Sequence, residues 1–349
     1  MRILILTLFL AFFISISSHA SSQSPEYLAY LPYIVKADPI PGYLNQVDIN
    51  HITETSRTLV EDFSPRHFDF YHIFINDQCS LGSQTWANHN LIRSSKYIST
   101  IYKSYGIPSY KEWLPDYYGS YNVVAEKTGS VYPGIFLDVG AHIDTRDTTP
   151  GASDNAAGVA AVVELARVLK DYPNRYSWRF IAFVGEEYGF VGSRYHIQLT
   201  QENRQVIKAG LIMDGIAWSE IAPLNMNCIW DYNLSENQRI AQLFDVVRQE
   251  YRIDIAWRRC QPGAGWWSDN AAYWKAGIPA VVSVGGLPYT DPNIHKCSDN
   301  MQNADLQNAY KTTLENLAVL LKLDAEEYQP ATFPPVQIPD PTQLGNPYH

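Results

Sequence analysis

The chain has 349 residues, of which 46% are hydrophobic and 18% are charged, so it can bury the core of one large domain. Its formal net charge is −10 and it contains no run of basic residues, which argues against nucleic acid as a partner.

Residues 1–20 have the pattern of a secretory signal peptide. Arg2 supplies the positive charge, Leu4 to Ile16 is an apolar run, and Ser18-His19-Ala20 suits cleavage. The apolar run is short for a helix that must cross ~30 Å of hydrocarbon, which disfavours a membrane anchor. We therefore expect an exported protein, secreted or periplasmic, with no membrane association after the signal is cleaved.

Apolar spacing predicts alternating strands and helices along the middle of the chain. After an irregular segment at 21–44, helices are predicted at 49–63, 91–105, 155–170, 188–201, 235–251 and 304–323. Strands are predicted at 121–126, 135–141, 178–184, 209–213 and 278–284. This order predicts an α/β fold with a mostly parallel, mixed central sheet and helices on both faces. The Pro-rich segment 326–349 is expected to be a tail.

Acidic residues or His follow four of the predicted strands. They are His142 with Asp144, Glu186 with Glu187, Asp214, and His295. Ligands bind outside the carboxyl ends of parallel strands, so we expect these side chains to lie at one edge of the sheet. Two His and several carboxylates, without Cys, suit a divalent metal such as zinc.

Two further residue positions complete the predicted chemistry. Asp154 lies at a predicted helix start, where we expect capping to fix its position, and its two oxygens could bridge two ions. Glu186 and Glu187 are adjacent, so their side chains diverge. We therefore expect one of them to bind metal and the other to accept a proton from water.

Six motifs follow one another along the chain: HIDT, PGASDNAAG, GEEYGFVGS, IMDGIAW, GWWSDNAAYWKAGIPA and PNIHKCSDN. In this order they resemble the M28-type secreted di-zinc aminopeptidases over roughly residues 45–325. The resemblance implies a phosphorylase/hydrolase-like α/β fold, with a zinc peptidase domain over those residues.

The resemblance also implies a role for each motif residue. The implied ligands of two Zn²⁺ per chain are His142, Asp154, Glu187, Asp214 and His295. Asp154 would bridge the ions, with His142 and Asp214 on one and Glu187 and His295 on the other. Glu186 would be the general base, and Asp144 would orient the His142 ring. The implied reaction is hydrolysis of N-terminal residues from peptides with a free N-terminus, by a metal-bridging water.

The sequence departs from the family pattern at two positions. Asn270 stands where the family often has His in an SDH motif, which weakens a substrate contact at Asp269. Ile294 stands where several relatives carry a Tyr that steadies the oxyanion. Trp266 and Trp267, in a Gly-rich loop beside the site, are the other candidate substrate contacts.

Other activities fit the same scaffold. A glutaminyl-peptide cyclotransferase uses a related fold with one zinc, and a carboxypeptidase or dipeptidase would share the metal site. A non-catalytic binding ectodomain is disfavoured because no implied ligand is missing. The preferred N-terminal residue and the oligomeric state do not follow from the sequence.

The four Cys are expected to form two disulfides in an oxidising compartment. Three pairings exist. Cys260 and Cys297 both lie in loops at the predicted site edge, which favours joining them and leaves Cys79 with Cys228. None of the four has the spacing of a zinc knuckle, so we expect no Cys-based metal site.

Overall fold

The structure is a computed structural model that describes most of the chain. The described residues are 38–68, 79, 87–115, 117, 119–231, 235–260, 268–287 and 290–330. The predicted signal peptide at 1–20, most of the segment 21–44 and the tail beyond residue 330 lie outside them. None of the described helices is both long and apolar enough to cross a membrane.

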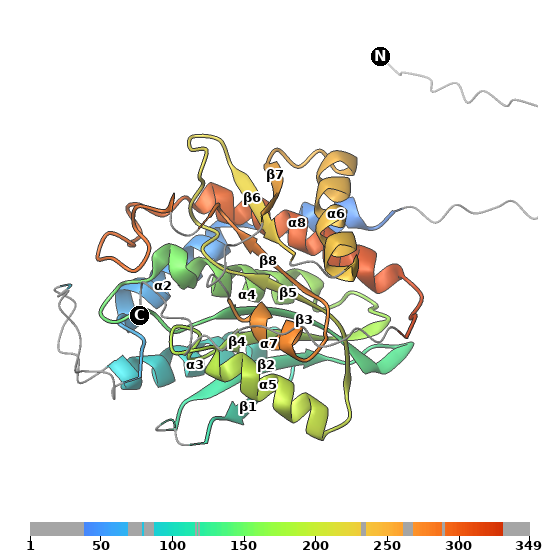
Figure 1. Ribbon diagram of the computed structural model, residues 1–349, viewed down its shortest axis with the longest axis horizontal. Coiled ribbons are helices and arrows are strands. Elements are labelled where there is room, and N and C mark those ends of the chain that lie inside the picture. Colours follow the sequence, from blue (N-terminus) through green and yellow to red (C-terminus); the bar gives the residue numbers. More distant parts are fainter. Residues whose placement is uncertain are drawn as a thin grey trace, which may run out of the picture. The chain divides into compact units, whose positions relative to one another are not determined.

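A mixed sheet runs through the middle of the fold (Figure 1). Its strands are β1 (Ser109–Trp113), β2 (Tyr121–Lys127), β3 (Tyr132–His142), β4 (Tyr176–Phe183), β5 (Val206–Met213), β6 (Met226–Trp230), β7 (Ala256–Cys260) and β8 (Ala280–Val284). Their order in space is β1-β2-β4-β3-β5-β8-β6-β7. The neighbours β4, β3, β5 and β8 are parallel, whereas β2 and β6 pair antiparallel with β4 and β8. The predicted fold class is confirmed.

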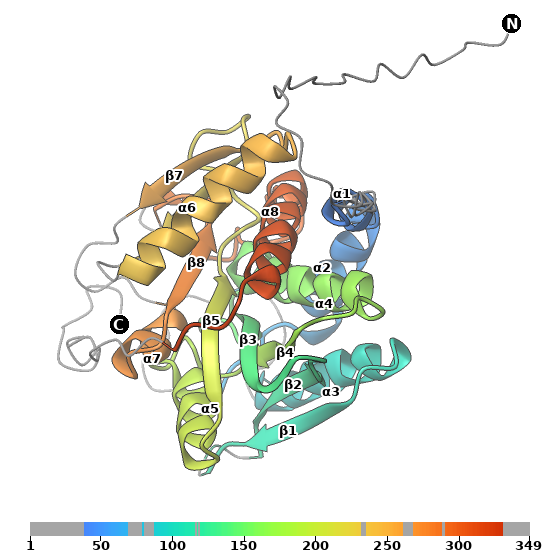
Figure 2. The same cartoon turned by 90° about the vertical axis from the view of Figure 1, so that its right-hand side faces the viewer.

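Helices cover both faces of the sheet, and Figure 2 shows α4 and α8 on one side of the central strands and α5 and α7 on the other. The first face carries α1 (Ile40–Leu44), α2 (Ile49–Phe63), α3 (Ala87–Ser104), α4 (Ala157–Leu169), α6 (Ser235–Glu250) and α8 (Leu306–Ala325). The second carries α5 (Val191–Glu202) and α7 (Asn270–Lys275). Each face has its own apolar core.

The central strands are buried on both faces because helices lie on both. In β3, Leu137 and Val139 belong to the larger core under α4 and α8, whereas Phe136 belongs to the smaller core under α5 and α7. Phe180 and Ile181 in β4 divide between the cores in the same way. Strands buried on two sides have nearly continuous apolar sequences, which is why they were recognisable.

All predicted helices and strands are present, with shifted ends. Helix α2 coincides with the prediction, whereas α5 begins at Val191 instead of residue 188. Gly189 and Phe190 have φ of 94° and 60°, which a right-handed helix cannot contain. The prediction missed α1, β1, β6, β7 and α7, and it assigned the α1 residues to an irregular segment. Helices α1 and α7 are too short to show a period, and β1 and β7 contain exposed residues that interrupt an apolar run.

A buried polar cluster lies between the sheet and α5. His196 of α5 places Nδ1 2.9 Å from Glu112 Oε1 of β1 and Nε2 3.2 Å from Asp138 Oδ2 of β3. The Tyr273 hydroxyl of α7 donates to the same Asp138 oxygen at 3.1 Å. Burial alone would lower the pKa of His196, but the two carboxylates raise it to about 9.

We expect this cluster to make the free energy of unfolding fall as the pH rises through about 9. The folded-state pKa of His196 lies above the ~6.5 of an unfolded His. The imidazolium therefore stabilises the fold fully below pH ~6.5, by on the order of 3 kcal/mol, and this contribution is lost as the pH rises through the folded-state pKa. Urea unfolding of the wild type and of His196→Gln at about pH 6 and about pH 10 measures it. A variant that loses as much stability as the wild type over this range would contradict the assignment.

Candidate metal centre and active site

The predicted strand-end residues lie at one edge of the sheet. His142 is the last residue of β3, Asp214 directly follows β5, Glu186 and Glu187 follow β4, and His295 lies in the loop after β8. Because β4, β3, β5 and β8 are parallel neighbours, their carboxyl ends meet at the same edge. The structure therefore brings together residues that lie up to 153 positions apart in the sequence (295 − 142).

Two groups of side chains, each able to hold a metal ion, share one carboxylate. In the first, His142 Nε2 lies 3.1 Å from Asp154 Oδ1 and 3.2 Å from Asp214 Oδ1. In the second, His295 Nε2 lies 3.3 Å from both Asp154 Oδ2 and Glu187 Oε2. The ligand atoms of each group lie within 4.8 Å of one another. Asp154 thus offers one oxygen to each group, in the same grouping that the family resemblance implied.

Asp154 is not a helix cap, so that prediction is wrong. Helix α4 begins at Ala157, and the Asn155 side-chain oxygen accepts the N–H of Gly158 at 3.2 Å. Asp154 lies in the irregular π-helical turn Ala152–Ala156, with φ −116° and ψ 86°. Its N–H and that of Ser153 donate to the two oxygens of Asp299, at 3.1 and 2.7 Å. Asp299, which the sequence prediction missed although it lies in the PNIHKCSDN motif, therefore holds the Asp154 backbone.

Asp144 contacts three residues of the site. Its backbone carbonyl lies 3.1 Å from His142 Nδ1, whereas its carboxylate is 3.6 Å away. The carboxylate instead accepts the N–H groups of Glu186 and Glu187, both at 3.2 Å. The carbonyl is thus the group at hydrogen-bond distance from the His142 ring, and the carboxylate fixes the backbone that carries the two Glu.

The ionisable groups of the site shift one another's pKa values. Burial raises the pKa of Glu186 well above its usual range, with Asp214 and Glu187 adding to the effect of burial. Burial opposes the charged forms of His142 and His295, but the surrounding carboxylates raise both pKa values well above 6.5. Burial would also raise the pKa of Asp154, but hydrogen bonds from the two His lower it. The carboxylates therefore favour positively charged groups at this edge, as the raised pKa values of the two His indicate.

A comparison with known protein families gives one match that includes these site residues. The model of the family described as Peptidase family M28 matches residues 122–320, which make up more than half of the chain. The chain belongs to peptidase family M28.

This M28 chain is also similar to individual known proteins. Aminopeptidase YwaD of Bacillus subtilis is 27% identical over 208 residues, which cover 56% of this chain and 42% of YwaD. The chain thus spans less than half the length of that relative. LapB from Legionella pneumophila superposes with a TM-score of 0.68 at 18% identity, over 84% of this chain and 77% of LapB. A glutaminyl cyclase from Bacteroides thetaiotaomicron superposes with a TM-score of 0.64 at 18% identity, over 81% of this chain and 99% of the cyclase. At these identities the two structures share the fold with this chain.

The donor set of the M28 site fits divalent metal ions. Each group combines one imidazole nitrogen with two carboxylates, a mixture that zinc binds. Glu187 Oε1 is buried and has no hydrogen-bond partner among the described residues, so it has an unused acceptor beside its group. Bound cations would neutralise Asp154, Glu187 and Asp214, whose ion-pair partners among the described residues are His142 and His295.

The structure describes one of the three predicted substrate contacts, Asp269. Asp269 is fully buried directly before α7, where burial raises its pKa to about 7 with further contributions from Asp144 and Asp214. Its role as a substrate contact stays a prediction. Trp266 and Trp267 lie outside the described residues.

Arg66 is a second residue that the sequence prediction missed. It is fully buried, and its guanidinium donates to the carbonyls of Ile143 at 2.7 Å, Pro150 at 3.1 Å and Gly151 at 3.2 Å. Burial lowers its pKa to about 10 even though Asp144, Asp299 and Asp154 are nearby. Arg66 therefore holds both ends of the loop between His142 and Asp154. It follows α2 without any motif, so the sequence offers no signal for this role.

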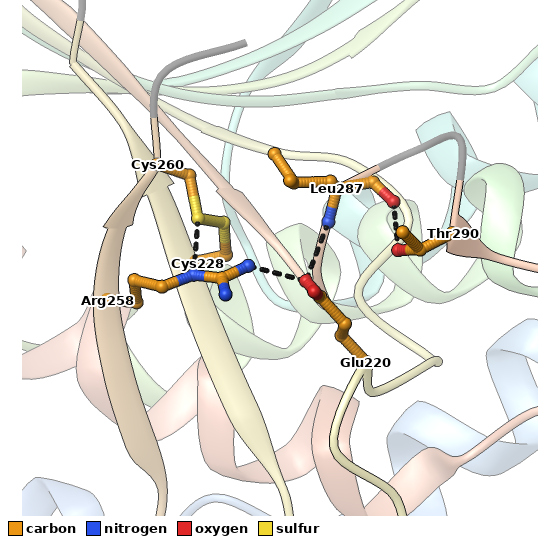
Figure 3. The surroundings of a disulfide bond; sticks show 6 residues. All are labelled: Glu220, Cys228, Arg258, Cys260, Leu287 and Thr290. Atoms are coloured by element: carbon orange, nitrogen blue, oxygen red, sulfur yellow. Dashed lines mark hydrogen bonds and ion pairs between the residues drawn. A yellow bond between two sulfur atoms is a disulfide. The ribbon is translucent and has the colours of Figure 1, made fainter.

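The disulfide pairing expected from the sequence is wrong. Cys79 bonds Cys297, and Cys228 bonds Cys260. The last two lie on the neighbouring parallel strands β6 and β7, which the sequence did not reveal. In Figure 3, Arg258 lies between this disulfide and Glu220, with Nε 3.2 Å from Cys260 Sγ and Nη2 2.5 Å from Glu220 Oε2. Cys297 lies two residues after His295, so the Cys79–Cys297 disulfide restrains the loop that carries this candidate metal ligand.

Proposed function

We propose that this M28 chain is an exported, zinc-dependent aminopeptidase that removes N-terminal residues from peptides. The observation that carries the proposal is the pair of donor groups sharing Asp154, with Glu186 directly before the donor Glu187 in the chain. Family membership supports a peptidase, and relatives of the chain such as YwaD are named aminopeptidases.

In this proposal two Zn²⁺ would be held, one by His142, Asp154 and Asp214 and the other by Asp154, Glu187 and His295. Bound zinc polarises a scissile carbonyl and makes water more acidic. Glu186 belongs to neither donor group, so its carboxylate is available to take a proton from the attacking water and deliver it to the leaving amine. The carboxylates of the site attract the substrate's α-ammonium group.

Chelation tests the metal requirement. We expect prolonged treatment with a chelator to abolish hydrolysis of aminoacyl fluorogenic substrates, and added Zn²⁺ to restore it, because both donor groups lose their ions. Metal analysis of the active protein should give about two zinc ions per chain. One ion per chain together with cyclisation of N-terminal Gln would favour the cyclotransferase. Unchanged hydrolysis after complete metal removal would refute the proposal.

Substrate blocking separates the peptidase classes. An aminopeptidase acts on free N-termini and fails on N-acetylated peptides, whereas a carboxypeptidase accepts the blocked peptides. A panel of free and N-acetylated peptides of the same sequence therefore distinguishes the two. Cleavage of both sets from the carboxyl end would overturn the aminopeptidase assignment.

Export is supported by the disulfides, because such bonds persist in oxidising compartments. We expect the mature protein to begin close to Ser21, which N-terminal sequencing of the protein isolated from its producing cells would show. A mature protein that still begins at Met1 would contradict signal cleavage.

A further inference from the structure

Asn122 of β2 joins the two ends of the loop that carries Glu186 and Glu187. Its Oδ1 accepts the N–H of Val184 at 3.1 Å, and its Nδ2 donates to the carbonyl of Gly192 at 2.9 Å. Strand β2 pairs with β4 from Val123, which lies opposite Ala182, to Lys127. Asn122 therefore lies one residue before the start of this pairing. The Asn122 side-chain oxygen thus accepts the Val184 N–H, a bond that a backbone carbonyl of a neighbouring strand would otherwise make.

The loop from Val184 to Gly192, here called the Glu186 loop, is closed at its base. The Gly192 N–H donates to the Val184 carbonyl at 2.8 Å, and the Val191 N–H donates to the Gly185 carbonyl at 2.9 Å. A Cβ at position 192 would lie 2.3 Å from Asn122 Oδ1, so glycine is needed for this approach. The Asp144 carboxylate also accepts the N–H groups of Glu186 and Glu187. The loop is therefore hydrogen-bonded both at its base and at the two Glu.

The orientation of the Asn122 amide follows from its partners. Val184 presents an N–H and therefore requires the oxygen, whereas Gly192 presents a carbonyl and requires the NH₂. The NH₂ also donates to Glu112 Oε2 at 3.0 Å, and the other oxygen of that carboxylate faces His196. Because Asn122 is fully buried, no water competes for these bonds.

We propose that Asn122 is a positioning residue for Glu186, and the proposal rests on the aminopeptidase function proposed above. Asn122 belongs to neither donor group, and its hydrogen bonds to the Glu186 loop are made at the base of the loop. Loss of its bonds lets the loop shift relative to the groups on β3 and β5. A displacement of about 1 Å at a reacting group can cost about 10²-fold in rate.

The test replaces Asn122 with Leu, which has a similar size and no polar atoms. We expect kcat to fall about 10²-fold while KM changes less than about three-fold and zinc content stays at the wild-type level. The matched control is Asn174→Leu. Asn174 is also buried and donates to the carbonyls of Lys127, Thr128 and Tyr176, but it lies just before the opposite end of β4. This control should lose stability to a similar degree and keep the wild-type kcat. Asn122→Ser, which leaves room for water, serves if the Leu variant does not fold.

Hydrogen–deuterium exchange provides a readout that does not depend on activity. Amides of residues 184–192 should exchange faster in the Asn122 variants than in the wild type and in Asn174→Leu. If the wild type hydrolyses no peptide, the proposed function is wrong. The exchange data would still show whether Asn122 holds the loop. Wild-type kcat in an Asn122 variant, an equal kcat loss in Asn174→Leu, or unchanged exchange would overturn the positioning role.

Discussion

Replacing Glu186 with Gln should lower kcat by about 10³-fold while the zinc content stays at the wild-type level. Gln has the size of Glu but cannot accept the proton of the attacking water. Glu186 belongs to neither donor group, so its replacement removes no metal ligand. Turnover of an aminoacyl fluorogenic substrate and metal analysis of the same sample measure the two effects.

Glu202→Gln is the matched control for this variant. Glu202 ends α5, is exposed, and accepts a hydrogen bond from Gln198. The same chemical change at that position should leave kcat unaltered. If the Glu186→Gln variant retains more than about a tenth of the wild-type kcat, Glu186 is not the general base.

Replacing Asp154 with Ala should remove most of the bound metal and reduce hydrolysis to background. Asp154 is the one member common to both donor groups, so each group keeps only two members. Loss of a residue that merely supports a ligand already costs about 10–100-fold in metal affinity, and we expect a larger loss for the shared ligand itself. Metal analysis after dialysis measures the result.

Asp147→Asn is the comparison variant for Asp154. Asp147 lies in the same loop, its side chain is 37% exposed, and its acidic group lies 3.8 Å from Arg146. Its φ is 44°, a conformation that Asn tolerates. This variant should keep the wild-type metal content. Normal zinc stoichiometry in Asp154→Ala would remove the shared-ligand assignment.

The parts of the fold that were predictable are those with a strong sequence pattern. Strands β3, β4 and β5 are buried on both faces, so their apolar runs identified them and their ends located His142, Glu187 and Asp214. The parallel arrangement then required these ends to meet at one edge. The site residues could therefore be grouped from the sequence, with the family motifs implying the individual roles.

The parts that were missed depend on contacts between distant segments. Strand β7 has the sequence AWRRC, whose two Arg are exposed, so neither alternation nor an apolar run marks it. Without β6 and β7, the pairing of Cys228 with Cys260 could not be foreseen. Asn122 and Asp299 act through backbone groups 60 or more positions away, for which the sequence contains no signal.

The Cys79–Cys297 bond closes a covalent ring that contains every strand of the sheet, because the two Cys are 218 positions apart. In the chain-entropy description a ring of this size stabilises the fold by about 5 kcal/mol, as much as the whole stability of a small domain. A single proteolytic cut anywhere inside the ring would leave both pieces joined. A chain cut in this way would remain one molecule and would separate into two fragments only after reduction.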